Sequence, residues 1–245
     1  MSPRVTAATA ARVLSQLRRD PRTVVLLLGV PSGLVVLLKY VFSGNPAVFD
    51  RIGGPLLGLF PFITMFIVTS ITMLRERTSG TLERLMSMPL GKLDLLLGYG
   101  VAFAAVAAAQ AAVVSAVALG GLGLDVAGSH WVVGALAVLN AVLGTALGLF
   151  VSAFARTEFQ AVQFMPALVF PQFLLCGLFV ARADMARGLE LASYAMPLTY
   201  AYDAIDLVTR HGEYGRAFAR DVAVTAGAAL AALVLGALTL RRRTP

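Results

Sequence analysis

Residues able to carry out acid, base or metal chemistry are few in this chain, and they are scattered. His130 and His211 are its two histidines, and neither has cysteine or carboxylate neighbours at the spacing of a metal site. No G-x-S-x-G sequence is present, so the chain lacks the turn that exposes a nucleophilic serine. Gly91 and Lys92 are followed by Leu93, where a phosphate-binding loop needs serine or threonine. We therefore expect no catalytic residue, no metal and no cofactor bound by this chain.

The stretch 75–99, RERTSGTLERLMSMPLGKLDLLLGY, has the composition of a docking loop. A turn is predicted at residues 78–80, and a short helix from Gly80 ends at Pro89, because proline cannot continue it. A short helix with an apolar stripe can insert into a groove on a partner protein, and the alternative is a loop lying on lipid headgroups. Its expected apolar anchors are Leu82, Leu85 and Met86, and its polar rim is Glu83 and Arg84.

Long apolar segments flank this loop and dominate the chain. Hydrophobic residues make up 58% and charged residues 13% of the 245 residues, whereas soluble domains have about 25% charged residues. A helix needs roughly 20 apolar residues to cross a bilayer, and its backbone groups bond within the helix. Charged residues delimit six such segments, at 24–42, 52–74, 95–119, 131–154, 161–181 and 222–240. We expect an all-α, polytopic membrane protein with six transmembrane helices in a single domain, 1–245.

Polar side chains inside the predicted spans are the candidates for a transport path. Gln110 lies in the third span and Asn140 in the fourth, at a depth where polar groups are costly and often functional. An interhelical hydrogen bond is the favoured alternative for both. The spans carry no Asp, Glu or Arg at their middle, which argues against an ATP-independent secondary transporter driven by ions.

Glycine pairs spaced four residues apart predict close packing of helices. The packing can lie within the chain, which is the favoured reading, or at the face of a dimer. The pairs are Gly29 and Gly33, Gly54 and Gly58, and Gly144 and Gly148.

The positions of Lys and Arg orient the predicted spans. Basic residues gather before the first span, in the 75–92 loop, at Arg156 and in the 241–243 tail. The positive-inside rule therefore places both termini in the cytoplasm. The net charge of +7 follows from this topology, so we expect no nucleic acid as a partner. Residues 4–20 combine arginines with apolar residues at helical spacing, which predicts a helix on the inner membrane surface.

Residues 182–221 are long for a simple outer loop. They include a charge-free run, LASYAMPLTYAY at 191–202, that is too short to span a bilayer. We expect two short helices that dip into the outer leaflet and meet near Pro197, with Tyr200 near the interface, where amphipathic rings are favoured. Asp203 is expected to face water or a partner protomer, because exposure to lipid would be costly.

Three stretches of the chain resemble the permeases of type-2 ABC transporters. Residues 76–98, ERTSGTLERLMSMPLGKLDLLLG, are similar to the family's hallmark loop, which commonly reads E-R-E-x-G-T-L-E-x-L-x-x-x-P-x-x-x-x-E-x-x-x-G. Residues 196–208, MPLTYAYDAIDLV, resemble its P-L-T-Y-x-x-x-A-x-R segment, with Asp206 where the family often has arginine. Residues 19–42 resemble the R-D-P-R-T opening of the drug-resistance branch, which includes daunorubicin-resistance permeases.

The resemblance implies an export permease with an N-terminal interfacial helix and a re-entrant helical hairpin before the last span. Such permeases work as dimers on two separate ATPase subunits, which bind ATP and Mg. The 80–89 helix would be a cytoplasmic coupling helix, and the 182–221 segment would shape the outer gate. The implied coupling residues are Glu76, Gly80, Thr81, Leu82, Glu83, Arg84, Leu85, Met86 and Pro89, and the outer-gate residues are Pro197, Tyr200 and Asp203.

The resemblance also implies a function. We expect a permease subunit, not itself an enzyme, in the plasma (inner) membrane of a bacterium. The short tail before the first span and the apolar interior favour an amphipathic drug-like or lipid-like substrate, moved out of the cytoplasm or the inner leaflet. Export of a lipid or glycan precursor is the alternative. The second permease protomer can be an identical chain or a paralogue.

Overall fold

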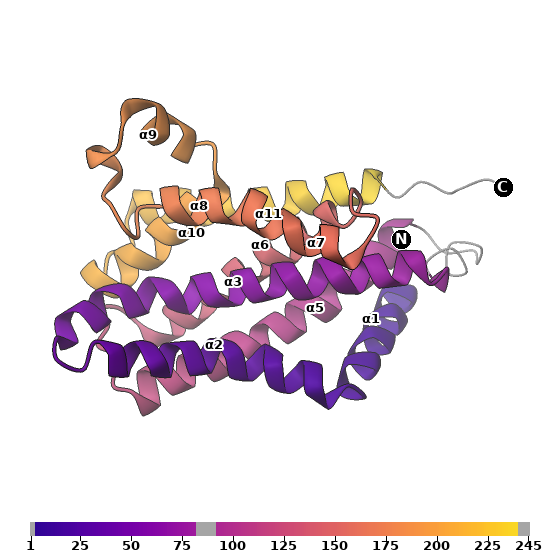
Figure 1. The fold of residues 1–245 in the computed structure, drawn as a ribbon, viewed down its shortest axis with the longest axis horizontal. Coiled ribbons are helices and arrows are strands. Elements are labelled where there is room, and N and C mark those ends of the chain that lie inside the picture. The colour runs from indigo at the N-terminus through magenta and orange to yellow at the C-terminus, as the bar shows by residue number, and fades with distance from the viewer. Residues whose placement is uncertain (1–2, 82–91, 240–245) are drawn as a thin grey trace.

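The computed structural model describes residues 3–81 and 92–239, and these ranges fold into helices and connecting loops without strands (Figure 1). The long helices lie roughly along the long axis of the molecule. A shorter helix, α1 (Pro3–Arg18), crosses one end of this bundle, which we name the α1 end. The long helices are α2 (Pro21–Val41), α3 (Pro46–Thr78), α5 (Lys92–Ser115), α6 (His130–Val151) and α11 (Arg216–Leu238).

Five helical segments of the described ranges are long and apolar enough to cross a membrane. They are Pro21–Val41, Pro46–Thr78, Leu97–Gly121, His130–Val151 and Arg216–Gly236. The third of these joins α5 to a π-helical segment, η1 (Ala116–Gly121). With 33 residues, α3 is about 50 Å long, which exceeds the roughly 30 Å hydrocarbon core of a bilayer. Its two ends therefore extend beyond the apolar layer.

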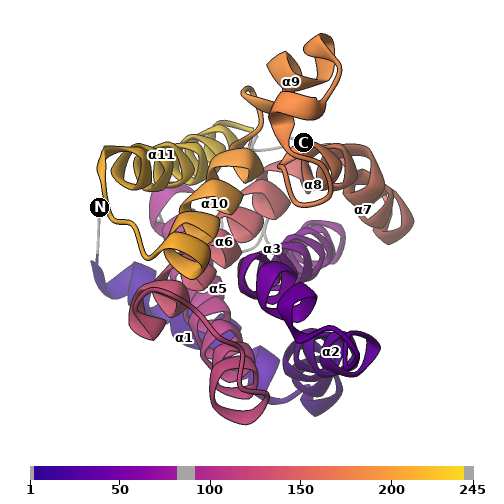
Figure 2. The ribbon, with the colours of Figure 1, turned by 90° about the vertical axis from the view of Figure 1, so that its left-hand side faces the viewer.

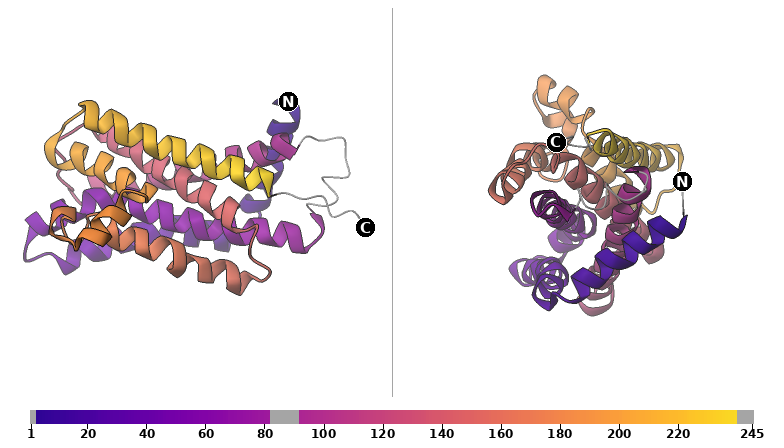
Figure 3. Two further views of the ribbon diagram at one scale, coloured as in Figure 1. Left: turned by 90° about the horizontal axis from the view of Figure 1, so that it is seen from above. Right: turned by 90° about the vertical axis from the view of Figure 1, so that its right-hand side faces the viewer.

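The fifth predicted span, 161–181, differs from the other five. Its residues form three consecutive segments, α7 (Glu158–Phe164), the π-helical η2 (Met165–Val169) and α8 (Phe170–Leu175), which follow one another beside α3 (Figures 1 and 3). Pro166 and Pro171 interrupt the regular helix, because proline lacks an N–H and its ring crowds the carbonyl four residues earlier. Regular helix ends at Leu175, so residues 176–180 form bends instead of the predicted last turns.

The central helices α3 and α6 lie side by side (Figure 2) and approach each other closely at glycines of α6. A β-carbon at Gly144 would lie 2.2 Å from the carbonyl oxygen of Phe62, and one at Gly148 would lie 2.5 Å from that of Phe66. These small residues let the two backbones touch, so this glycine pair packs within the chain. A β-carbon at Gly29 would meet nothing within 4 Å.

The flanking helices α2 and α11 lie on opposite sides of the bundle (Figures 2 and 3). Only 17% of the most apolar part of α2 and 22% of that of α11 is buried, against 61% for both α3 and α6. Apolar side chains such as Leu26, Leu230 and Leu238 are accordingly exposed. These two flanks are surfaces for lipid or for another membrane helix.

The end opposite α1, which we name the α9 end, carries a group of short helices. After η3 (Arg182–Asp184), α9 (Arg187–Ser193) stands off the bundle (Figure 1), and α10 (Pro197–Asp206) returns into it. Residues on α10 such as Leu198 and Ile205 are completely buried. The Leu198 N–H donates to Oε1 of Gln172 on α8 at 3.3 Å, which satisfies one free N–H at the start of α10. A π-helical segment, η4 (Leu207–His211), links α10 to α11.

Candidate functional site

Glu76, the first of the expected coupling residues, is buried at the α1 end of α3. It is 7% exposed, and its Oε1 accepts a hydrogen bond from Nη1 of Arg12 at 3.2 Å. The same guanidinium donates from Nη2 to the Tyr99 hydroxyl and lies over the Tyr99 ring, 5.5 Å from its centroid. Arg12 therefore ties α1 to both α3 and α5.

Sequence reasoning predicted a helix over residues 4–20 on the membrane surface and named no partner for Arg12, so it missed this contact. A signal was present in the sequence, because Arg12 adjoins the apolar Val13, which is buried in the structure. An arginine beside the apolar stripe of a surface helix can reach the protein beneath it with its long side chain.

The chain turns immediately after α3, where the 78–80 turn was predicted. Gly80 has a φ of +71°, a left-handed conformation that glycine adopts without steric cost. The hydroxyl groups of Ser79 and Thr81 are hydrogen-bonded at 3.0 Å. The remaining coupling residues, Leu82, Glu83, Arg84, Leu85, Met86 and Pro89, lie outside the described residues.

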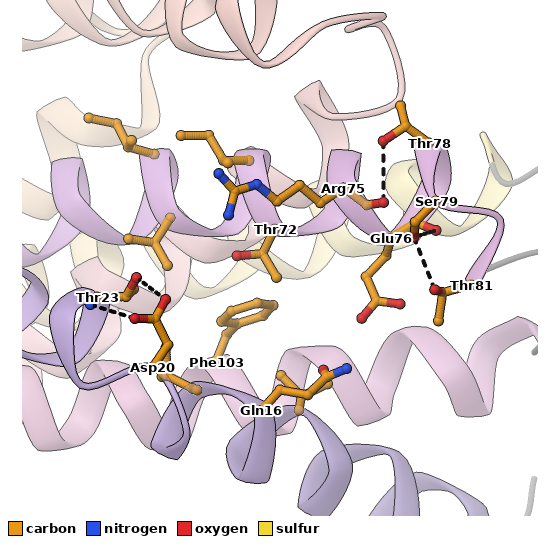
Figure 4. Close-up of a pocket in the computed structure, with 15 residues that line it drawn as sticks. Gln16, Asp20, Thr23, Thr72, Arg75, Glu76, Thr78, Ser79, Thr81 and Phe103 are labelled. Atoms are coloured by element: carbon orange, nitrogen blue, oxygen red, sulfur yellow. Dashed lines mark hydrogen bonds between the residues drawn. The ribbon is translucent and has the colours of Figure 1, made fainter.

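A cavity of about 770 Å³ lies beside this junction, between α1, α2, α3 and α5 (Figure 4). Apolar side chains form one part of its wall, and polar side chains form the rest. The wall is therefore amphipathic. Its apolar residues are Val13, Leu17, Ile67, Val68, Ile71 and Phe103; its polar residues are Gln16, Asp20, Thr23, Thr72, Arg75, Glu76, Thr78, Ser79 and Thr81.

Asp20 places a fixed negative charge at this cavity. It is the N-cap of α2, and its carboxylate accepts hydrogen bonds from the Thr23 N–H at 3.2 Å and the Thr23 hydroxyl at 2.6 Å. These bonds from Thr23 hold the pKa of the Asp20 carboxyl below its ordinary value. Asp20 is therefore ionised at neutral pH.

The positive charge of Arg75, in the same wall, is already paired. Its Nε and Nη2 donate to the two carboxylate oxygens of Glu158 at 2.7 and 3.0 Å. This two-point geometry is the one in which a guanidinium binds a carboxylate most specifically. It joins the end of α3 to the start of α7.

The two candidate path residues are buried and bonded between helices. Gln110 is fully buried, and its Nε2 donates to the Leu27 carbonyl on α2 at 2.8 Å. Asn140 is 1% exposed, and its Nδ2 lies 3.5 Å from the Ala201 carbonyl on α10, at the limit of a hydrogen bond. These contacts match the interhelical alternative, and a role in a path stays a prediction.

The expected outer-gate residues lie together at the α9 end. Pro197 is the first residue of α10, and the Tyr200 hydroxyl donates to the Tyr194 carbonyl at 2.9 Å. Asp203 accepts a 2.7 Å hydrogen bond from Nη1 of Arg182, a residue that sequence reasoning did not single out. Burial raises the pKa of the Asp203 carboxyl, and Arg182 opposes that shift. Within 3–81 and 92–239, no three His, Cys, Asp or Glu side chains lie together as metal ligands would.

The described residues form a bundle of apolar helices, with a buried charged junction at the end of α3 beside the 75–99 sequence. A family model described as "ABC-2 type transporter" matches residues 4–208, from α1 through α10 to the start of η4. The chain belongs to the ABC-2 type transporter family. The resemblance noted in the 76–98 and 196–208 segments is thereby confirmed, and the chain is a multi-pass membrane protein of the permease type.

Two relatives of this ABC-2 chain are described as parts of ABC transporters. The chain is 28% identical over 148 residues to the "Probable multidrug ABC transporter permease YbhR" of Escherichia coli K12, an alignment covering 60% of this chain and 40% of that one. It is 24% identical over 164 residues to "ABC transporter G family member 20" of Dictyostelium discoideum, covering 66% of this chain and 22% of that one. The matched region thus spans less than half the length of either relative.

Proposed function

We propose that this chain is the membrane permease subunit of an ATP-driven ABC exporter that moves an amphipathic drug-like or lipid-like molecule out of the cytoplasm or inner leaflet. The observation that carries the proposal is the family match over residues 4–208, which includes the expected coupling segment. The word "multidrug" in the name of the Escherichia coli relative and the amphipathic cavity favour this substrate class. Export of a lipid or glycan precursor is the alternative within the same mechanism.

In this proposal the chain crosses a bacterial plasma membrane six times. The segments α7, η2 and α8 supply the fifth crossing, in addition to the five long apolar helical segments, because residues 158–175 run as consecutive helical turns and would be about 27 Å long. Both termini and α1 then lie on the cytoplasmic side, and α9 and α10 form the re-entrant hairpin on the outer side. The C-terminal end of α3, which carries Arg75 and Arg77, faces the cytoplasm, as the positive-inside rule requires.

ATP and Mg would be bound by two separate ATPase subunits, whose closure moves the coupling helices of two permease protomers. The junction of Arg12, Glu76 and Tyr99 gives that movement a route, since it joins the end of α3 to α1 and α5. The apolar flanks of α2 and α11 are available for the second protomer and for lipid. The permease itself contributes the path and the gate and performs no hydrolysis.

The test is purification of the tagged chain from its native membrane, followed by identification of co-purifying proteins and a transport assay. We expect an ATPase subunit with Walker motifs, and uptake of amphipathic dyes by inverted vesicles that requires ATP hydrolysis. Uptake should stop with a non-hydrolysable ATP analogue. Equal uptake without ATP, or with an ion gradient alone, would show that the chain is a secondary transporter.

A further inference from the structure

The turn between α1 and α2 gathers exposed positive charge at the α1 end of the molecule. Because α1 ends at Arg18 and α2 begins at Pro21, Arg18, Arg19 and Arg22 follow one another closely along the chain. All three residues are exposed. The Arg19 N–H donates to the Ser15 carbonyl at 3.2 Å, which continues the helical bonding pattern into the turn. The arginines therefore stand on an ordered backbone.

The positive charge of this turn exceeds the negative charge beside it. No ion pair joins the three guanidinium groups to a carboxylate within residues 3–81 and 92–239. Asp20 is the one acid among residues 18–22; its carboxylate is hydrogen-bonded to Thr23 and is attracted by Arg22. Asp20 therefore offsets one of the three positive charges, and the remaining two attract an anion to the turn.

Exposed apolar residues lie one helical turn from the arginines on both helices. Leu14 precedes Arg18 by four residues on α1, and Leu26 follows Arg22 by four residues on α2, so each pair shares a helix face. Leu26 is 63% exposed and belongs to the uncovered flank of α2. An arginine one turn before such a membrane-facing residue lies where the apolar layer ends and the lipid headgroups begin.

An anionic phospholipid fits this surface better than a second copy of the chain. Each described acid at the α1 end already has an interaction within its own chain: Glu76 with Arg12, Glu158 with Arg75, and Asp20 and Asp94 with other residues. A second copy therefore has no spare carboxylate to offer the arginines in the described ranges. A phospholipid carries a phosphate at its head and acyl chains below it, which is the order of arginine and apolar residue along α2.

We propose that the α1–α2 turn binds the headgroup of an anionic phospholipid, with Arg18, Arg19 and Arg22 around the phosphate and an acyl chain along Leu26 and Val30. The planar fork of N–H donors in a guanidinium matches the oxygens of a phosphate. The proposal goes beyond the proposed function, because it needs a membrane-spanning chain and neither an ATPase nor an exported substrate. A lipid held at this turn fixes α1 against the membrane surface.

The experiment measures quenching of a single tryptophan by brominated lipid in the full chain, reconstituted without ATPase. The chain has one tryptophan, Trp131, which is 89% exposed at the start of α6. Trp131→Phe combined with Val25→Trp moves this reporter beside Arg22, to a position that is exposed. The vesicles are phosphatidylcholine with increasing fractions of dibromo-phosphatidylglycerol or of dibromo-phosphatidylcholine.

We expect phosphatidylglycerol to bind beside the Val25→Trp reporter about tenfold more tightly than phosphatidylcholine. The preference should fall as salt is added, because salt screens exposed charges. In the chain that keeps Trp131, far from the turn, the two brominated lipids should quench equally. Equal quenching at the Val25→Trp reporter, or the same preference at Trp131, overturns the proposal.

Variants in the reporter chain assign the preference to these arginines. Each of Arg18→Gln, Arg19→Gln and Arg22→Gln should lower the preference about two- to threefold, and the triple variant should abolish it. The single variants decide the question even if the triple variant does not insert. The matched control is Arg156→Gln, which removes an exposed arginine at the same end but beside α7 and should keep the preference. An unchanged preference in all three single variants, or an equal loss in the control, overturns the proposal.

Transport and co-purification distinguish this proposal from the proposed function. If the complex exports amphipathic dyes with ATP while the reporter shows no lipid preference, the exporter stands and the lipid site is wrong. If the preference is found and depends on the arginines but no ATP-driven export occurs, the site stands and the exporter is wrong. If the triple variant keeps its lipid preference and loses the ATPase, the arginines bind the ATPase and the lipid site is wrong.

Discussion

Arg182 and Asp203 form the ion pair that holds the short helices at the α9 end. Their side chains are 23% and 18% exposed, and the Arg182 guanidinium also lies 5.7 Å from the centroid of the Tyr194 ring. Removing one partner of a largely buried pair lowers stability by more than the intact pair contributes, because the other charge stays buried without a partner.

Asp203→Asn should therefore loosen α9 and α10 locally. The Arg182 charge would lack its counter-charge, and we expect amide hydrogen exchange of residues 187–206 to become about tenfold faster. Hydrogen exchange with mass spectrometry measures this directly. The matched control is Glu190→Gln, which removes the pair with Arg187, a residue whose side chain is 80% exposed; exposed pairs contribute little. Equal exchange in the two variants would contradict the assignment.

Gly144→Ala tests the contact between the central helices. Because the new β-carbon would lie 2.2 Å from the Phe62 carbonyl oxygen, α3 and α6 would have to separate, at a cost of about 1–3 kcal/mol. The expected result is a lower thermal unfolding temperature of the chain in detergent. Gly134→Ala, on the same helix, is the control, since nothing lies within 4 Å of that position. If both variants unfold at the same temperature, the close approach does not exist.

The contacts of individual side chains were the least predictable feature of this molecule. The sequence places Gln110 and Asn140 inside apolar segments, and burial and interhelical contact follow from that placement. It gives no information on which charge from a distant segment completes a pair, because Arg12 and Glu76 meet only after α1 folds across the bundle. The amphipathic cavity was missed for the same reason.

At the scale of elements, the proposed mechanism depends on the segment from Gly80 to Pro89. Its predicted apolar anchors would be desolvated in a groove of an ATPase. Leu82→Asp would put an unpaired charge there, a penalty on the order of several kcal/mol, whereas removing a rim charge changes much less. Leu82→Asp should thus abolish co-purification of the ATPase and transport, and Glu83→Ala should reduce coupling only partly.

The measurement compares both variants with the wild type at equal abundance in the membrane. Six inserted spans in Leu82→Asp, checked by protease protection, exclude a general folding defect. Retention of the ATPase and of transport by Leu82→Asp would mean that the segment is a surface connection only.

Where the helices are regular, their ends lie close to the ends of the spans predicted from the apolar pattern. The predicted 24–42 span corresponds to Pro21–Val41, and 131–154 corresponds to His130–Val151. The pattern failed at 161–181, where hydropathy alone does not register the backbone effect of Pro166 and Pro171. Prolines alone do not predict such a break either, because Pro31 lies inside the continuous helix α2 and Pro55 and Pro61 lie inside α3.

For the molecule as a whole, the two ends of the bundle make the topology testable. The C-terminal part of α11 and α1 lie toward one end, and α9 lies at the other (Figure 1). In a Cys176→Ser background, a cysteine in the 241–245 tail should react with a membrane-impermeant maleimide only after permeabilisation. A cysteine near Gly212, at the exposed Glu213 beside η4, should react in intact cells. The reverse labelling pattern would overturn the orientation.

The membrane class and the family could be predicted from the whole sequence because both depend on features repeated along the chain. The length of the apolar segments and the 76–98 motif can be recognised in the sequence without knowing which residues contact one another. The central position of α3 and α6 could not be predicted in this way. All of the long helices are apolar, and only their packing shows that α2 and α11 are left uncovered.

The contacts of Gly144 and Gly148 also limit how the bundle can move. Each glycine faces one carbonyl, and the two carbonyls are one helical turn apart on α3. If α6 slid along α3 by a turn of about 5.4 Å, one glycine would still face a carbonyl, but Asn140 or Ser152 would have to occupy the other tight position. We therefore expect α3 and α6 to travel together as one rigid unit when the path opens, and rotation of that unit against α2 and α11 to supply the conformational change.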